Sequence, residues 1–204
     1  MTSKERVKLA LEHKKGDRLA RDFAAEPDVW LKLMEHFGVE SKDEVLVELG
    51  VDCRVISYDF EAFCSPEGDI KPIGVCDTNT WKRNRGDGVV NDVWGACRKH
   101  IKNDFTDYED LCEFPLGEAK SIEDLKNYNW PKAEWWDFGK INDVIERVNP
   151  GDEYHLRWRM GSIFETSWSL RGFDKFFMDL ALNRDMACYI LDRVTEIHME
   201  NLRR

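Results

Sequence analysis

The residue placed best for chemistry in this sequence is an aspartate at the end of an apolar stretch. Residues 51–58 are typical of a buried strand, and Asp59 follows at its carboxyl end. In open α/β sheets and closed barrels, working residues gather at the carboxyl ends of strands. Asp59 is therefore the first candidate for a catalytic carboxylate. The alternative is an ordinary loop aspartate that caps the next turn.

A second group of candidates comes from residues 153–160, which alternate as a strand does. His155, Arg157 and Arg159 fall on one face, and the other face is mostly apolar. The forked guanidinium of arginine suits a carboxylate, so this face is a candidate cradle for a carboxylate-bearing substrate if it points into a barrel. The alternatives are an edge strand with a solvated basic face, or pairing with acidic neighbours within the protein.

The elements around these strands carry clear helix signals. Thr2 with Glu5 and Ser41 with Glu44 form capping boxes, and the second box opens a helix over residues 42–49. Pro27 suits the first turn of a helix, and Gly38 suits its end. Residues 18–23 are a candidate first strand. These elements, together with the stretch before Asp59, predict an α/β protein.

The remaining chain divides into a turn-rich part and a helical part. Turn residues across 64–104 predict an excursion of short antiparallel strands, with Asp87-Gly88 as the hairpin turn. Helices are expected over 121–128 and 141–148. From Ile163 the sequence predicts helices to the end, with breaks near Gly172 and Asn183. The last helix places five apolar residues on one face: Met186, Ile190, Val194, Ile197 and Leu202.

Composition limits the classes of function. The net charge of −10 repels nucleic acid and anionic lipid, so neither is expected as a partner. No apolar stretch reaches the length of a membrane span, and no signal peptide opens the chain. The six cysteines form no CxxC pair. These features predict a cytoplasmic protein with reduced thiols. The eight tryptophans fit core or rim packing better than a ring-binding site.

Five segments resemble the uroporphyrinogen decarboxylase superfamily, and they occur in the same order along the chain. They are SKERVKLALEHKKGDRLARDF, GVDCRVISYD, GDGVVNDVWGACRK, PLGEAKSIEDLKNYNWP and GSIFETSWSLRGFDKFFMDLALN. The resemblance implies a (β/α)8 barrel, of which this chain, as a single domain over residues 1–204, would be the N-terminal part. The excursion over 64–104 would be an insertion in it. The family includes uroporphyrinogen decarboxylase and corrinoid-dependent methyltransferases.

The resemblance also assigns roles to single residues. Asp59 matches the aspartate that holds the pyrrole nitrogens in the decarboxylase. Where the decarboxylase has an arginine-rich loop, this chain has FAAEPDVW, with Ala25 and Val29 in place of arginines. The decarboxylase's tyrosine falls near Trp168 or Ser169, which leaves Trp168 as the substrate-binding candidate there.

These matches imply three functions. The first is a methyltransferase-like enzyme acting with a corrinoid or a small methylated substrate. The second is a porphyrinogen carboxy-lyase of tetrapyrrole biosynthesis, and the third is a partial barrel that acts as a binding or assembly module. For a full-length methyltransferase the resemblance implies zinc and a corrinoid, whereas no cofactor is expected in this chain alone. The expected partners are a small-molecule substrate and a corrinoid protein or a second chain that completes the barrel.

Overall fold

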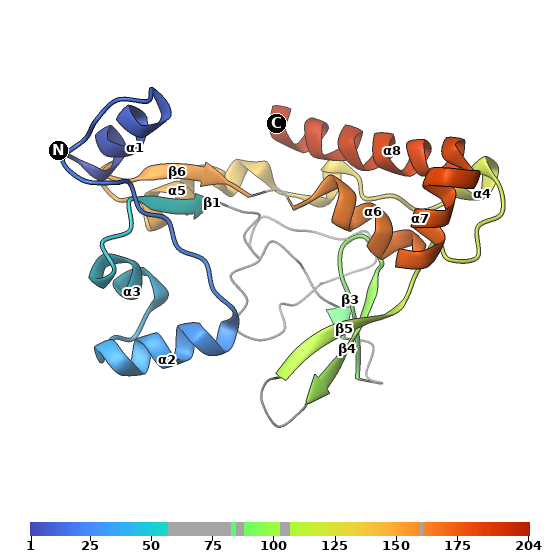
Figure 1. The fold of residues 1–204 in the computed structure, drawn as a ribbon, viewed down its shortest axis with the longest axis horizontal. Helices are drawn as coiled ribbons and strands as arrows, with labels where there is room; N and C mark the ends of the chain where they lie inside the picture. The colour runs from blue at the N-terminus through green and yellow to red at the C-terminus, as the bar shows by residue number, and fades with distance from the viewer. Residues whose placement is uncertain (57–82, 85–87, 103–106, 160) are drawn as a thin grey trace. The chain divides into compact units, whose positions relative to one another are not determined.

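The protein is a mixed α/β structure with one small parallel sheet and one antiparallel sheet. The computed structural model describes residues 1–56, 83–84, 88–102, 107–159 and 161–204. They form two compact units (Figure 1). The described residues of the first unit are 1–56 and 139–159, and those of the second lie within 83–138 and 161–204. Each unit is considered by itself.

The described residues of the first unit form the parallel sheet and four helices. Strand β1 (Cys53–Ile56) pairs in parallel with β6 (His155–Trp158), and the register sets Cys53 beside His155 and Val55 beside Arg157. The helices are α1 (Ser3–Leu11), α2 (Pro27–Phe37), α3 (Lys42–Glu48) and α5 (Ile141–Val148). Parallel neighbours require a long crossover connection, and here the crossover includes α5 and the whole antiparallel sheet.

The helix boundaries in this unit follow the capping residues. Thr2 caps α1 and Ser41 caps α3, each through a complete capping box, as predicted. Pro27 is the first residue of α2, and Gly38 ends that helix with a left-handed φ of 67°. A turn at residues 149–152 follows α5, with positive φ at Gly151 and Asp152.

The predicted strand at residues 18–23 is wrong. This segment is extended but belongs to neither sheet, and Leu19 is 88% exposed. A single backbone bond joins it to the edge of β1, from the Asp52 N–H to the Arg21 carbonyl at 2.9 Å. The Arg21 N–H donates instead to the Asp52 carboxylate at 2.8 Å. A side chain thus takes the donor that a β-ladder would need.

The second unit begins with the antiparallel sheet, whose strand order is β2-β3-β4-β5. The strands are β2 (Arg83–Asn84), β3 (Val89–Asn91), β4 (Cys97–Lys102) and β5 (Asp107–Glu113). The predicted excursion is therefore present, but it continues beyond residue 104 to Glu113. The predicted hairpin turn falls between β2 and β3, where Gly88 has a φ of 82°.

Helices form the rest of the second unit. The α-helices are α4 (Ile122–Lys126), α6 (Ile163–Arg171), α7 (Phe173–Leu182) and α8 (Arg184–Arg203). Two short 3₁₀ helices, η2 (Ala133–Trp135) and η3 (Phe138–Lys140), precede α5. The boundary between the two units falls within η3, after Phe138. The predicted breaks are confirmed at Gly172 and Asn183. Gly172 has a φ of 93°, a conformation that costs little only for glycine.

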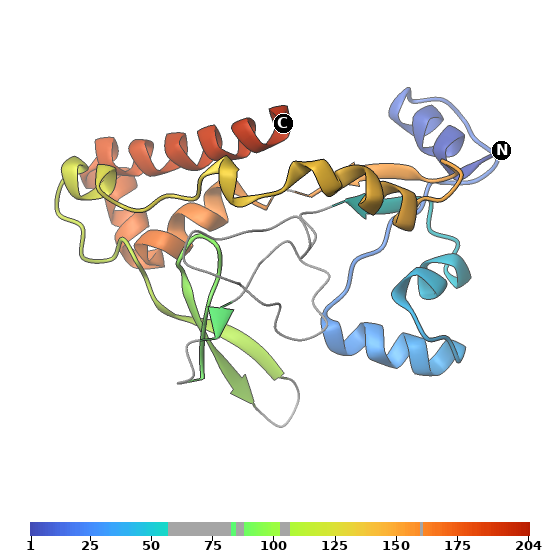
Figure 2. The same cartoon turned by 180° about the vertical axis from the view of Figure 1, so that it is seen from behind.

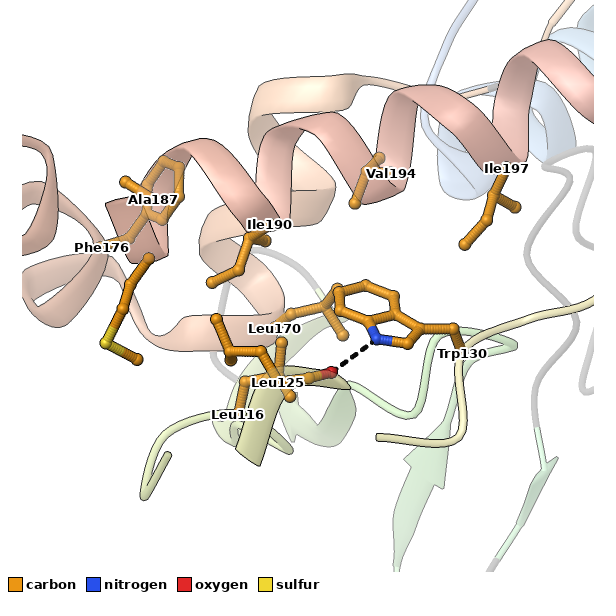
Figure 3. Packing of buried hydrophobic residues seen from close by; sticks show 10 residues of the cluster. Leu116, Leu125, Trp130, Leu170, Phe176, Ala187, Ile190, Val194 and Ile197 are labelled. Carbon is orange, nitrogen blue, oxygen red and sulfur yellow. Dashed lines mark hydrogen bonds between the residues drawn. The ribbon is translucent and has the colours of Figure 1, made fainter. Parts of the chain in front are cut away.

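The core of the second unit packs α8 against α4, α6 and the segment after α4. Ile190 and Val194 of α8 are fully buried and face Leu125, Leu170 and Trp130 (Figure 3). The Trp130 indole N–H donates to the Leu125 carbonyl at 2.8 Å, which satisfies the one polar atom of that ring.

The prediction that Leu202 shares one face of α8 with the buried apolar residues is wrong. Met186, Ile190, Val194 and Ile197 are buried, but Leu202 is 52% exposed. The helical spacing continues from Ile197 to Asn201, which is 3% exposed. Hydrophobicity favoured the leucine, whereas helix geometry buries its polar neighbour.

Candidate functional site

The side chain of Asp52, which directly precedes β1 and is fully buried, accepts hydrogen bonds from several segments of the first unit. Arg18 donates to both of its carboxylate oxygens, at 2.6 and 2.9 Å. Arg6 of α1 donates to Oδ1 at 2.5 Å. The second edge of the Arg6 guanidinium bonds Asp17, at 2.6 and 2.8 Å. Asp52 thus joins α1, the extended segment and β1.

The protonation state of Asp52 decides what it can do. Burial by itself raises the pKa of this carboxyl, but the hydrogen bonds from Arg18, the Arg21 backbone, Ser3 and Arg6 outweigh burial and lower the pKa to about 2. The hydrogen bond from Arg6 likewise lowers the pKa of Asp17. A carboxyl with so low a pKa is too weak a base, and too rarely protonated, to transfer protons efficiently near neutral pH. We therefore assign Asp52 a structural role as the clamp of the first unit.

The predicted cationic face lies on the β1–β6 pair. The register sets Val55 beside Arg157, so both side chains share one face of the sheet. The Arg157 guanidinium forms an ion pair with Asp22 of the extended segment, at 3.0 Å between Nη2 and Oδ2. Arg157 is 47% exposed and Asp22 is 39% exposed. The pair therefore matches the alternative of an acidic neighbour within the protein, and about half of the Arg157 side chain stays exposed to solvent.

Cys53 lies on the same face, beside His155, and is buried. Burial raises the pKa of the Cys53 thiol, the charge of Asp22 raises it further, and Arg157 opposes both. The group is therefore a protonated thiol at neutral pH. Because the thiolate is the reactive form of cysteine, Cys53 is poorly suited to act as a nucleophile.

Arg54 on the opposite face is a residue that sequence reasoning missed. Its guanidinium carbon lies 3.6 Å from the centre of the Tyr154 ring, a cation–π contact. Its Nη1 donates to the carbonyls of Val51 and Cys53, at 3.2 and 2.9 Å, and the residue is 3% exposed. The feature of the sequence that could have identified Arg54 is the presence of an arginine within an otherwise apolar strand. We assign it to the packing of this strand pair.

The structure places the other predicted site residues as follows. His155 is half-buried at the start of β6, and Arg159 is exposed just beyond its end. The Arg159 N–H donates to the Ile56 carbonyl at 3.0 Å and extends the parallel pairing. Trp168 lies on α6 in the second unit, half-buried, with its ring centre 5.5 Å from that of Phe173. Asp59 lies outside the described residues.

An open groove of about 580 Å³ lies in the second unit, between α8 and the segment that follows α4. Lys126, Lys132 and Arg193 bring positive charge to it, and Asp192 and Glu196 bring negative charge. Arg193 and Glu196 pair with each other at 3.0 Å. Because charges of both signs line the groove, it favours no single class of charged ligand.

Among the described residues, no group of three histidine, cysteine, aspartate or glutamate side chains could hold a metal ion. Within the same residues, no helix combines the length and apolar character needed to cross a bilayer. No protein-family model matches the chain, and neither does any of the curated proteins or solved structures compared with it.

Proposed function

We propose that β1 and β6 are neighbouring strands of a (β/α)8 barrel, and that the chain is the N-terminal part of an enzyme of the uroporphyrinogen decarboxylase superfamily. The support is the parallel pairing of two strands joined by a crossover that contains a helix. Two strands cannot close a barrel, so the other parallel strands would come from residues outside the described ranges or from another chain.

The observation that carries our choice of branch is the charge of residues 22–30. This segment contains Asp22, Glu26 and Asp28 and no arginine or lysine. The Ala25 carbonyl accepts a bond from the Trp30 indole at 3.0 Å, and α2 begins just after Glu26. A grip on a porphyrinogen with several carboxylates requires cations. The acidic segment therefore favours the methyltransferase-like function over the carboxy-lyase.

In this proposal the face of β6 binds substrate. Asp22 orients the Arg157 guanidinium, and the exposed part of the Arg157 side chain holds an anionic group of the corrinoid or of a small methylated compound. His155 lies on the same face as a second polar group. The roles of Asp59 as an acidic residue and of Trp168 as a substrate-binding residue rest on the sequence resemblance alone. A corrinoid would accept or supply the methyl group. The described residues do not fit a zinc site, so we derive no step through zinc.

Two parallel assays test this proposal on the purified chain. One follows the loss of the cobalt–methyl absorbance when methylcobalamin is mixed with a small thiol. The other follows carbon dioxide release from uroporphyrinogen. We expect activity only in the first assay. Carbon dioxide release would contradict the proposal in favour of the carboxy-lyase. Inactivity in both, together with no corrinoid binding, would favour the non-catalytic module.

A further inference from the structure

Two cysteines lie next to each other across the last two strands of the antiparallel sheet. The register pairs Cys97 of β4 with Glu113 of β5, and the next pair is Arg98 with Leu111. Cys112 is therefore the extra residue of a β-bulge, in which two residues of one strand oppose one residue of the other. The bulge places Cys112 opposite the segment that holds Cys97, although the two cysteines are 15 positions apart in the sequence.

The Cys112 side chain reaches across to β4. Its Sγ donates to the Cys97 carbonyl oxygen at 3.5 Å. The Cα atoms of opposed residues in antiparallel strands lie about 4.5–5.5 Å apart, and disulfides bridge Cα separations of about 4.4–6.8 Å. Adjacent antiparallel strands therefore hold two opposed cysteines at a spacing that a disulfide can bridge.

The two thiols differ in their access to solvent. Cys112 is exposed, whereas Cys97 is 5% exposed and its Sγ donates to the Gly95 carbonyl at 3.5 Å. Both thiols are reduced in the structure. A dissolved oxidant reaches the exposed thiol first, and a second thiol beside it can resolve the oxidised form. An accessible cysteine next to a resolving cysteine is the arrangement found in redox-sensing pairs.

We propose that Cys97 and Cys112 form a reversible disulfide when the protein meets hydrogen peroxide. The Cys112 thiolate attacks the peroxide, the O–O bond breaks, and Cys112 becomes a sulfenic acid while one water leaves. The Cys97 thiol then attacks the Cys112 sulfur, the S–S bond forms, and the sulfenic hydroxyl leaves as a second water. Two thiols are thus oxidised as one peroxide is reduced. A dithiol reverses the reaction by thiol–disulfide exchange.

The disulfide ties a terminal strand of the sheet to its neighbour. Among the described residues, β5 is at one end of the strand order and pairs with β4. The bridge also moves the Cys97 sulfur away from Gly95, in a turn where the Trp94 carbonyl accepts a bond from Tyr128 at 2.7 Å. The proposal does not depend on the proposed enzymatic function, because it rests on β4 and β5 alone.

Peptide mapping of the full chain after treatment with hydrogen peroxide tests the proposal. Remaining thiols are first blocked with N-ethylmaleimide. Trypsin then places Cys97 and Cys112 in separate peptides, residues 86–98 and 103–120. The two peptides should appear as one linked species, lighter than their sum by two hydrogens, and dithiothreitol should separate them. Cys112→Ser should abolish the linked species. Cys188→Ser is the matched control, because Cys188 is a half-buried thiol on α8, and the link should persist.

Hydrogen exchange measures the effect of the link on the sheet. Amides of β5 should exchange at least about tenfold more slowly in the oxidised chain than in the reduced chain, because a cross-link disfavours opening of the strand pair. Cys112→Ser should show no such difference after peroxide. The proposal would be overturned if peroxide left both thiols reduced, if Cys112 went to sulfinic acid without a link, or if it linked to another cysteine. A Cys97–Cys112 link with unchanged exchange in β5 would overturn the claim that the disulfide ties the strand.

Discussion

At the scale of single residues, the charged side chains of the first unit divide into a closed cluster and an open pair. Asp52, Arg6, Arg18 and Asp17 bond one another within 3 Å, and Asp52 is fully buried. The Asp22–Arg157 pair is half exposed. Buried, saturated groups hold a fold together, whereas exposed cations remain available to a ligand.

The first prediction concerns the clamp. Asp52→Asn keeps the shape of the side chain but leaves Arg6 and Arg18 without the carboxylate. We expect the free energy of unfolding to fall by about 3–5 kcal/mol in urea denaturation. Asp152→Asn is the control, because it breaks the exposed ion pair with Lys4 and should cost less than about 1 kcal/mol. Equal losses in the two variants would contradict the role of Asp52.

The lowered pKa of Asp52 predicts a dependence of stability on acid. A carboxyl whose pKa is lower in the folded state stabilises the fold above its unfolded pKa, and this contribution disappears as the pH falls to the folded value. For Asp52 the window runs from 3.8 down to about 2. Urea midpoints across this window should fall more steeply for wild type than for Asp52→Asn. Parallel curves would show that Asp52 does not titrate there.

The cysteines give a third residue-scale prediction. Cys112 is exposed, whereas Cys53 is buried and its thiol pKa is raised. Ellman's reagent should therefore modify Cys112 at least about tenfold faster than Cys53 in the folded chain. Peptide mass spectrometry after partial labelling would distinguish the two sites. Rapid labelling of Cys53 in native buffer would refute its burial.

At the scale of elements, α8 organises the second unit through one buried stripe. Ile190→Ala removes a fully buried side chain from the core and should lower the free energy of unfolding by about 2–5 kcal/mol. Leu202→Ala, on the exposed side of the same helix, should change it by less than about 0.5 kcal/mol. Urea unfolding followed by tryptophan fluorescence compares the two, and similar losses would mean that the stripe is misplaced.

The elements also show how far the sequence predicts this fold. Capping boxes, Gly38 and Gly172 located the helix ends because a helix end depends on a few neighbouring residues. Residues 18–23 were predicted as a strand because local pattern says nothing of Asp52, 31 residues away from Arg21, whose carboxylate takes the Arg21 N–H. Leu202 was misplaced because hydrophobicity was preferred to helical spacing.

The candidate site was predictable to a smaller extent. Alternation in β6 identified the face of His155 and Arg157, and the parallel register confirms that the two lie along one strand face. The pairing of Arg157 with Asp22 and the stacking of Arg54 on Tyr154 were not predicted, because both depend on contacts between segments distant in sequence. The role of Asp59 stays a prediction.

At the scale of the whole molecule, the proposed function rests on the first unit. Its parallel strand pair supports a barrel enzyme with an acidic segment where a porphyrinogen grip would need arginines. The second unit packs around α8, and a substitution in its core such as Ile190→Ala leaves Arg157 unchanged.

The most direct measurement of the central claim is a binding titration on the wild-type chain, with tryptophan fluorescence as the signal. Methylcobalamin should bind and coproporphyrin should not, and Arg157→Gln should weaken corrinoid binding about tenfold. Arg193→Gln, which removes a comparable surface ion pair in the second unit, should leave the binding unchanged. The account would be contradicted if coproporphyrin bound tightly and methylcobalamin did not bind. It would also be contradicted if Arg157→Gln and Arg193→Gln changed methylcobalamin binding equally.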